Sequence, residues 1–139
     1  MSRPVEGGLR ERIEAIEAAY EFMLAYAAQG VAGDEEGGST EIRAQLKRSA
    51  GALDGLADLF RELVAARGLE PTEPYTSFVD ALDRDARGAR AAIQIALAQP
   101  AISSQLIDNL NALIQLRSLL TDLFFVDEVL KRPSGPESE

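Results

Sequence analysis

The spacing of apolar residues constrains the fold of this chain more than any other feature of its sequence. Along four segments, apolar side chains recur in alternating steps of four and three, which places them on one face of an α-helix. Glycine or proline separates these segments, and none of them alternates as a β-strand would. The predicted helices cover residues 9–29, 40–67, 77–98 and 102–131. We therefore expect an all-α domain over residues 1–132, an antiparallel four-helix bundle of up-down-up-down topology, followed by a disordered tail at 133–139.

The chain contains neither cysteine nor histidine, and this excludes many kinds of active site. Disulfides, cysteine nucleophiles, Ser-His-Asp triads and histidine-ligated metals all need one of these residues. The Glu-x-x-His motifs of di-metal bundle proteins are missing for the same reason. The sequence therefore predicts no enzyme, no catalytic residue, no metal and no cofactor.

The chain is acidic, with a formal net charge of −9. A nucleic-acid partner is not expected, because binding to phosphates needs a basic surface. Several acids, among them Asp34, Glu35 and Glu36, fall in predicted connections, either as solvated loops or as a docking surface for a basic partner. No segment resembles a secretory signal or reaches the ~20 apolar residues of a membrane span, so a cytoplasmic protein is expected.

The fourth predicted helix is apolar over more than half of its circumference. An ordinary surface helix buries a narrower arc, so another chain is expected to cover part of this face. A symmetric homodimer is the commonest arrangement of that kind, and a different protein partner is the alternative. The predicted interface residues are Leu116, Leu119, Leu123, Phe125, Val126 and Leu130.

Arg117 lies within one apolar seam of this helix and needs a partner if it is buried. Counting residues outward from Pro100 and Ala101 places Asp85 opposite it, which predicts a buried Asp85–Arg117 ion pair that fixes the register of two helices. Alternatively, Arg117 anchors an anionic ligand inside the bundle, with Tyr20 or Tyr26 contributing a hydroxyl.

Two smaller features of the second predicted helix are also open to interpretation. Gly51 and Gly55 weaken a helix, and we expect that another backbone approaches them closely; a weak point in the helix is the alternative. Arg43, Lys47 and Arg48 form a basic cluster that is expected to face solvent.

The predicted function is that of a non-enzymatic protein-interaction module, such as an adaptor, chaperone or regulatory accessory protein, acting through the apolar face of the last helix. The first alternative is a bundle that binds or senses a small anionic ligand near Arg117. The second is a coat protein on a granule or a membrane surface.

Overall fold

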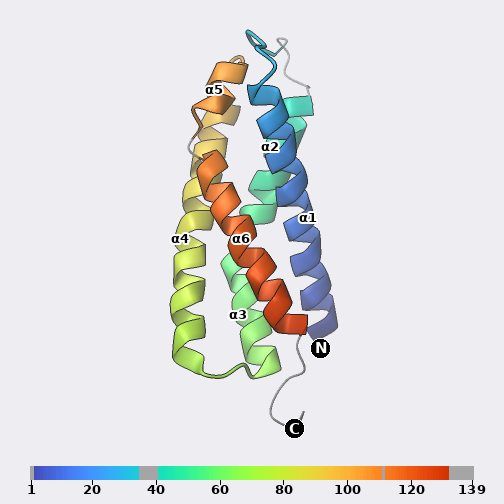
Figure 1. Cartoon of the computed structure of the whole chain (residues 1–139), viewed down its shortest axis with the longest axis vertical. Coiled ribbons are helices and arrows are strands. Elements are labelled where there is room, and N and C mark those ends of the chain that lie inside the picture. Colours follow the sequence, from blue (N-terminus) through green and yellow to red (C-terminus); the bar gives the residue numbers. More distant parts are fainter. Residues whose placement is uncertain (1, 35–40, 111, 132–139) are drawn as a thin grey trace.

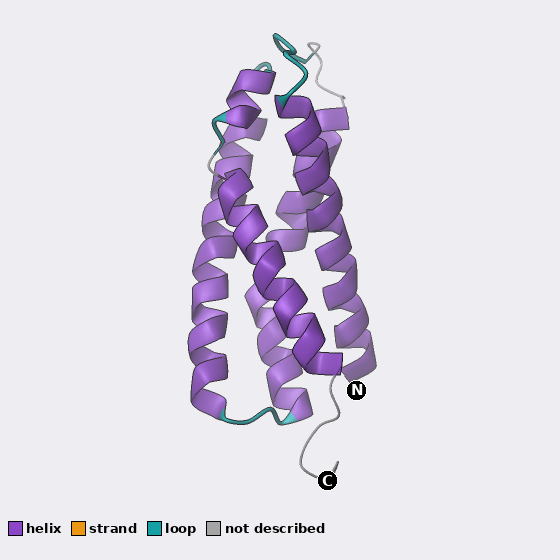
Figure 2. Cartoon of the chain, in the orientation of Figure 1, coloured by secondary structure: helices purple, strands orange, loops and turns teal. Residues whose placement is uncertain are grey.

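Helices make up most of the described part of the chain, residues 2–34, 41–110 and 112–131 (Figure 1). In this computed structural model the side chains of residues 2–7 are not described, and the predicted tail at 133–139 lies outside the described residues. Figure 2 shows loops between the helices and no strand in these ranges, which confirms the all-α prediction. The helices are α1 (Ser2–Ala27), α2 (Glu41–Leu53), α3 (Leu56–Arg67), α4 (Thr72–Leu97), α5 (Ser104–Asp108) and α6 (Ala112–Lys131).

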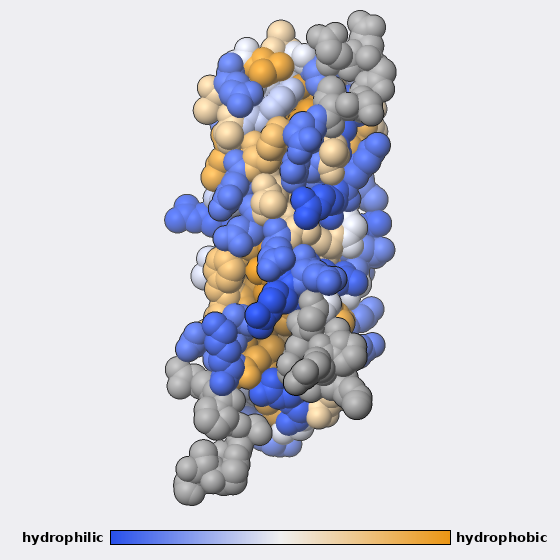
Figure 3. Space-filling model, turned by 90° about the vertical axis from the view of Figure 1, so that its right-hand side faces the viewer, coloured by the Kyte–Doolittle hydropathy of each residue, from blue (hydrophilic) through white to orange (hydrophobic). Residues whose placement is uncertain are grey.

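The long helices lie side by side and enclose one apolar core (Figure 1). Helix α1 packs against α2, α3 and α6, and α4 packs against the same helices. The face seen in Figure 3 is mainly hydrophilic, with small hydrophobic patches between the polar side chains. None of the described helices is long and apolar enough to cross a bilayer. The largest fully buried side chains are Ile16, Met23, Ile42, Leu46, Leu56, Phe60, Leu63, Leu82, Ile93, Ile102, Ile107 and Leu116.

Helix α4 begins at Thr72, five positions before the predicted start at residue 77. The segment before residue 77 contains Pro74, and proline disfavours the interior of a helix. However, proline is tolerated in the first turn, because its missing N–H would have no partner there. The early start places Tyr75 on α4, where it becomes part of the site described below together with Phe78.

The helix predicted over residues 40–67 is divided into α2 and α3, which corrects the sequence prediction. Gly55 has a φ of +73°, a left-handed conformation that glycine adopts easily and that ends regular helical geometry. A Cβ atom built on Gly51 or Gly55 would contact nothing within 4 Å. The expected close backbone contact is therefore wrong, and Gly55 instead allows the break.

Two arginines bind main-chain carbonyls near this break, of which that of Ala50 also accepts from the N–H of Asp54 at 3.2 Å. Arg12 of α1 donates to the carbonyl oxygens of Ala52 and Asp54, and Arg90 of α4 donates to that of Ala50 at 3.2 Å. Carbonyls at a helix C-terminus lack intrahelical partners and attract cations. The break therefore connects α2 to both of its neighbours.

The helix predicted over residues 102–131 is also divided, into the short α5 and the longer α6. The hydroxyl of Ser103 caps α5 by accepting a hydrogen bond from the N–H of Leu106 at 2.9 Å. After Asp108 the chain continues in tight turns, with the N–H of Leu110 bound to the carbonyl of Ile107 at 3.0 Å. The apolar seams before and after the break are consequently not one continuous stripe.

The buried side chain of Arg43 joins α2 to Asp34, in the segment after α1, and to the C-terminal end of α4. Nε of Arg43 donates to Oδ2 of Asp34 at 2.7 Å, and the two side chains are only 11% and 3% exposed. Its terminal nitrogens donate to the carbonyl oxygens of Leu97, Gln99 and Pro100 at 3.0, 2.8 and 3.2 Å. The prediction that Arg43 faces solvent is wrong, because these acceptors, distant in the sequence, satisfy a guanidinium in the interior.

The polar contacts continue from Asp34 into the segment that precedes α5. Oδ1 of Asp34 accepts from the N–H of Ile102 at 2.6 Å, and the Asp34 N–H donates to the Ile102 carbonyl at 3.1 Å. The Tyr26 hydroxyl donates to the same carbonyl. The Ser104 hydroxyl donates to the Tyr26 carbonyl and accepts from the N–H of Val31 at 2.8 Å. These bonds tie the end of α1 to the start of α5.

Replacing Arg43 should therefore destabilise the fold strongly. We expect R43M to lower the free energy of unfolding by about 3 to 5 kcal/mol, because Asp34 would remain buried without its cation. K47M, at an exposed position one turn along α2, should change it by less than about 0.5 kcal/mol. Chemical denaturation followed by circular dichroism measures both, and equal effects of the two variants would contradict the assigned role of Arg43.

Candidate functional site

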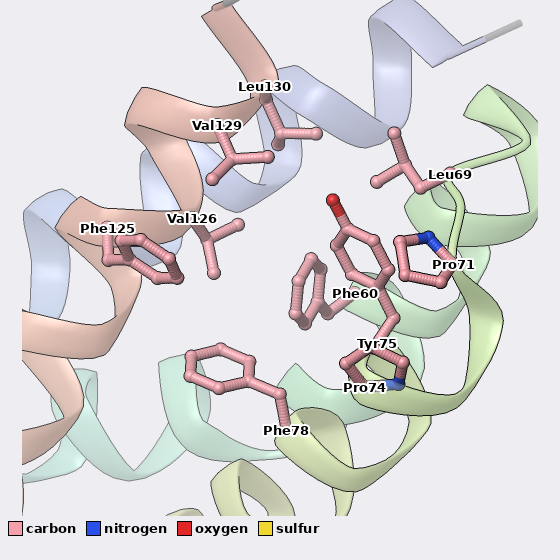
Figure 4. A pocket seen from close by; sticks show the side chains of 10 residues that line it. All are labelled: Phe60, Leu69, Pro71, Pro74, Tyr75, Phe78, Phe125, Val126, Val129 and Leu130. Atoms are coloured by element: carbon pink, nitrogen blue, oxygen red, sulfur yellow. The ribbon is translucent and has the colours of Figure 1, made fainter.

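A pocket of about 310 Å³ opens between α3, the α3–α4 connection, α4 and α6 (Figure 4). Its walls are aromatic, aliphatic or proline side chains, and we refer to it as the aromatic pocket. The lining residues are Phe60, Leu69, Pro71, Pro74, Tyr75, Phe78, Phe125, Val126, Val129 and Leu130.

Three phenylalanine rings form a continuous edge-to-face series along one wall. Phe60 of α3 and Phe78 of α4 have ring centroids 6.2 Å apart and planes at 82°. Phe78 and Phe125 of α6 have centroids 6.0 Å apart and planes at 64°. This is the geometry that aromatic pairs prefer, so the rings hold one another while leaving space beside them.

The α3–α4 connection forms the opposite wall. Gly68, with a φ of +57°, caps α3, and its N–H binds the carbonyl of Ala65. The chain then turns through Leu69 and Pro71 into α4, where Tyr75 extends its ring toward the space between the connection and α6 (Figure 4). The turn chemistry of this short segment thus brings its apolar residues to the pocket.

The pocket is accessible and carries little polarity. Phe125 is 60% exposed at its edge. The hydroxyl of Tyr75 is the one polar side-chain group among the lining residues, and the structure gives it no hydrogen bond to another described residue. None of the ten described lining residues is charged. The site therefore suits apolar groups with at most one hydrogen-bonding atom at that hydroxyl.

Most of the predicted interface residues are buried within the chain itself. Leu116, Leu119, Leu123 and Val126 lie in the core, and Leu130 is partly buried. The wide apolar face of α6 is largely covered because the helix lies between α1 and α4 (Figure 1). As a surface for a partner, this set is corrected to Phe125, its one exposed member.

The predicted ion pair between Asp85 and Arg117 is not formed. Arg117 is exposed, and the ion pairs of the described residues do not include these two. The count predicted nearly the right alignment of residues along the two helix axes, because Phe78 contacts Phe125 and Gly88 lies against Gln115. It did not predict which residues face the core around the axis of α6, where Leu116 is buried and Arg117 is exposed.

The two tyrosines proposed beside Arg117 lie in different environments. Tyr20 and Arg117 line the same open depression between α1 and α6, together with Asp108. Tyr26 is buried at the end of α1, where burial and the charge of Asp34 raise the pKa of its hydroxyl and Arg43 partly opposes them. The structure thus brings Tyr20 to Arg117, with Asp108 nearby, and assigns Tyr26 to a structural hydrogen bond.

Sequence reasoning missed Phe60, Tyr75 and Phe78, although a signal for part of the pocket was present. Counting equal distances outward from Ala101, which pairs Asp85 with Arg117, places Phe78 opposite Phe124, next to Phe125. Aromatic residues at matching levels of a predicted helical hairpin therefore indicated a contact. The size and opening of the pocket depend on α3 and could not be inferred from this pairing.

Comparisons of the chain with protein-family models, with curated proteins and with solved structures found no match. Among the described residues, no group of acidic side chains gathers in a way that could hold a metal ion.

Asp85 faces another acid, Asp122, across α4 and α6. Burial, and to a lesser extent the charge of Asp85, raise the pKa of Asp122. The folded state then binds a proton more tightly than the unfolded state, so stability falls as the pH rises through the carboxylate range.

Replacing Asp122 with asparagine should remove this effect. We expect D122N to be more stable than the wild type at neutral pH by about 0.5 kcal/mol, with the difference vanishing near pH 3 as Asp122 becomes protonated. Thermal unfolding of both proteins at several pH values between neutral pH and about pH 3 measures this difference in stability. E62Q, at an exposed position of α3, is the control. Parallel pH profiles for D122N and the wild type would contradict the assignment.

Proposed function

We propose that the chain is a non-enzymatic binding module and that the aromatic pocket is its binding site. The observation that carries the proposal is an open space of about 310 Å³ with apolar walls and an exposed aromatic edge. Small-molecule sites typically have volumes of roughly 300 to 1,000 Å³ and apolar linings with few polar groups. The space has such a volume and lining, although Arg117, where an anionic-ligand site was predicted, is not one of its lining residues.

The chemistry of the pocket supports binding rather than catalysis. Among the described lining residues Tyr75 alone is ionisable, so none of the others can act as its acid or base partner. A lining without charges also offers no electrostatic stabilisation to a developing ionic transition state.

We also propose that the architecture is an antiparallel four-helix bundle of up-down-up-down topology. In this description α2 and α3 together form the second helix of the bundle, and α5 and α6 form the fourth. Helices α1 and α4 each pack against both α2 and α3, which supports counting those two helices as one unit. A cytoplasmic location remains a prediction from the sequence.

An apolar fluorescent probe tests the binding function. We expect N-phenyl-1-naphthylamine to bind the wild-type chain saturably, with increased emission as it leaves water. V129W should weaken this binding at least about tenfold, because the larger ring fills the pocket and removes the contacts of the probe.

The matched control is I95W, which introduces the same ring at an exposed position of α4. This variant should bind the probe as the wild type does, and circular dichroism checks that both variants are folded. The proposal would be wrong if the wild type showed no saturable binding, or if V129W bound the probe as tightly as I95W.

A second candidate function, homodimerisation, is favoured by a separate surface. Leu24 of α1 and Ile114 and Phe124 of α6 are large apolar side chains that are 46%, 70% and 48% exposed. Leu24 and Ile114 line the same open depression. We propose that, if the chain self-associates, it does so through these residues rather than through the buried leucines of α6.

Native mass spectrometry tests this second candidate. The wild type is expected to form a dimer, and the double variant I114E/F124E a monomer of unchanged helicity, because charged side chains would have to be buried in the interface. I95E, which places the same charge on α4, should remain dimeric. A monomeric wild type at micromolar concentration would exclude this interface.

A further inference from the structure

The volume of the aromatic pocket limits the size of its occupant. An enclosed apolar cavity of about 150 Å³ holds one benzene molecule. The pocket measures about 310 Å³, or roughly twice that space. Two fused six-membered rings therefore fit, whereas a longer ligand would have to extend through the open side past Phe125.

The walls favour a flat aromatic occupant over a flexible chain. Phe60, Phe78 and Phe125 already pair edge to face, with centroids 6.2 and 6.0 Å apart. A further planar ring system can continue this series at the same spacing, and each such pair adds attraction beyond the burial of area. A saturated or linear molecule of equal size buries similar area and lacks that contribution.

The hydroxyl of Tyr75 adds one directional requirement. It comes from the first turns of α4 and points into the space between α6 and the α3–α4 connection (Figure 4). Because the structure gives this hydroxyl no hydrogen bond to another described residue, it is free to bind a polar atom of the occupant. A single hydroxyl or carbonyl group on the ring system would form this hydrogen bond with the Tyr75 hydroxyl.

The same lining disfavours a charged group on the bound molecule. None of the described residues that line the pocket is acidic or basic, so a buried carboxylate, phosphate or ammonium group would lose its hydration without gaining a partner among them. An occupant that fills the space is therefore neutral where it is enclosed.

We infer that the aromatic pocket takes a neutral, planar aromatic molecule of about two fused rings that carries one hydroxyl or carbonyl group bound to the hydroxyl of Tyr75. This rests on the proposed function, since it specifies the ligand class of the same site. Val126 and Val129 of α6 contact one side of the ring system, and Leu69 of the connection contacts the other.

A pair of matched compounds tests the ligand class. 2-Naphthol and decahydro-2-naphthol share one carbon skeleton and one hydroxyl, but only the first is planar and aromatic. In isothermal titration of the full chain, 2-naphthol should bind about tenfold more tightly. Y75F should weaken 2-naphthol binding about three- to tenfold and leave naphthalene, which lacks the hydroxyl, unchanged.

The possible outcomes separate this inference from the proposed function. If both alcohols bind equally and V129W abolishes both, the pocket binds by volume alone, and the ligand class is wrong while the binding function stands. If Y75F leaves 2-naphthol binding unchanged, the hydrogen bond to Tyr75 is wrong. If neither alcohol nor N-phenyl-1-naphthylamine binds the wild type, both the inference and the proposed function fail.

Discussion

The buried guanidinium of Arg43 is the contact on which the arrangement of one end of the molecule depends. It lies between Asp34 on one side and the carbonyl oxygens that follow α4 on the other. A cation in such surroundings is stable only with all of these acceptors in place, so it fixes the positions of α2 and α4 and of the segment that carries Asp34. The position of Ile102, and with it the entry into α5, follows from the second carboxylate oxygen of Asp34.

Breaks in the helices are as important to the fold as the helices themselves. The left-handed Gly55 separates α2 from α3, and α3 then contributes Phe60 to the aromatic pocket. The break before α6 turns Leu116 toward the core and Arg117 toward solvent. The aromatic pocket thus depends on the helix breaks, which lie outside its own lining.

The all-α class and the core positions could be predicted because apolar spacing is a local property of the sequence. Ile42, Leu46 and Leu63, for example, are buried where the four-three rhythm places them. The burial of Arg43 could not be predicted, since its acceptors come from residues far away in the chain that become neighbours only after folding. Similarly, the aromatic pocket is a space left between side chains of three helices, and no single segment encodes its volume.

The use of arginine in the contacts between helices determines how the molecule responds to changes in pH. Arg12, Arg43 and Arg90 connect neighbouring helices through main-chain carbonyls, and arginine keeps its charge throughout the physiological range. The chain contains no histidine, and the raised pKa of Tyr26 keeps its hydroxyl protonated as a donor. The arginine and tyrosine donors that connect the helices therefore keep their protons between mildly acidic and mildly alkaline conditions.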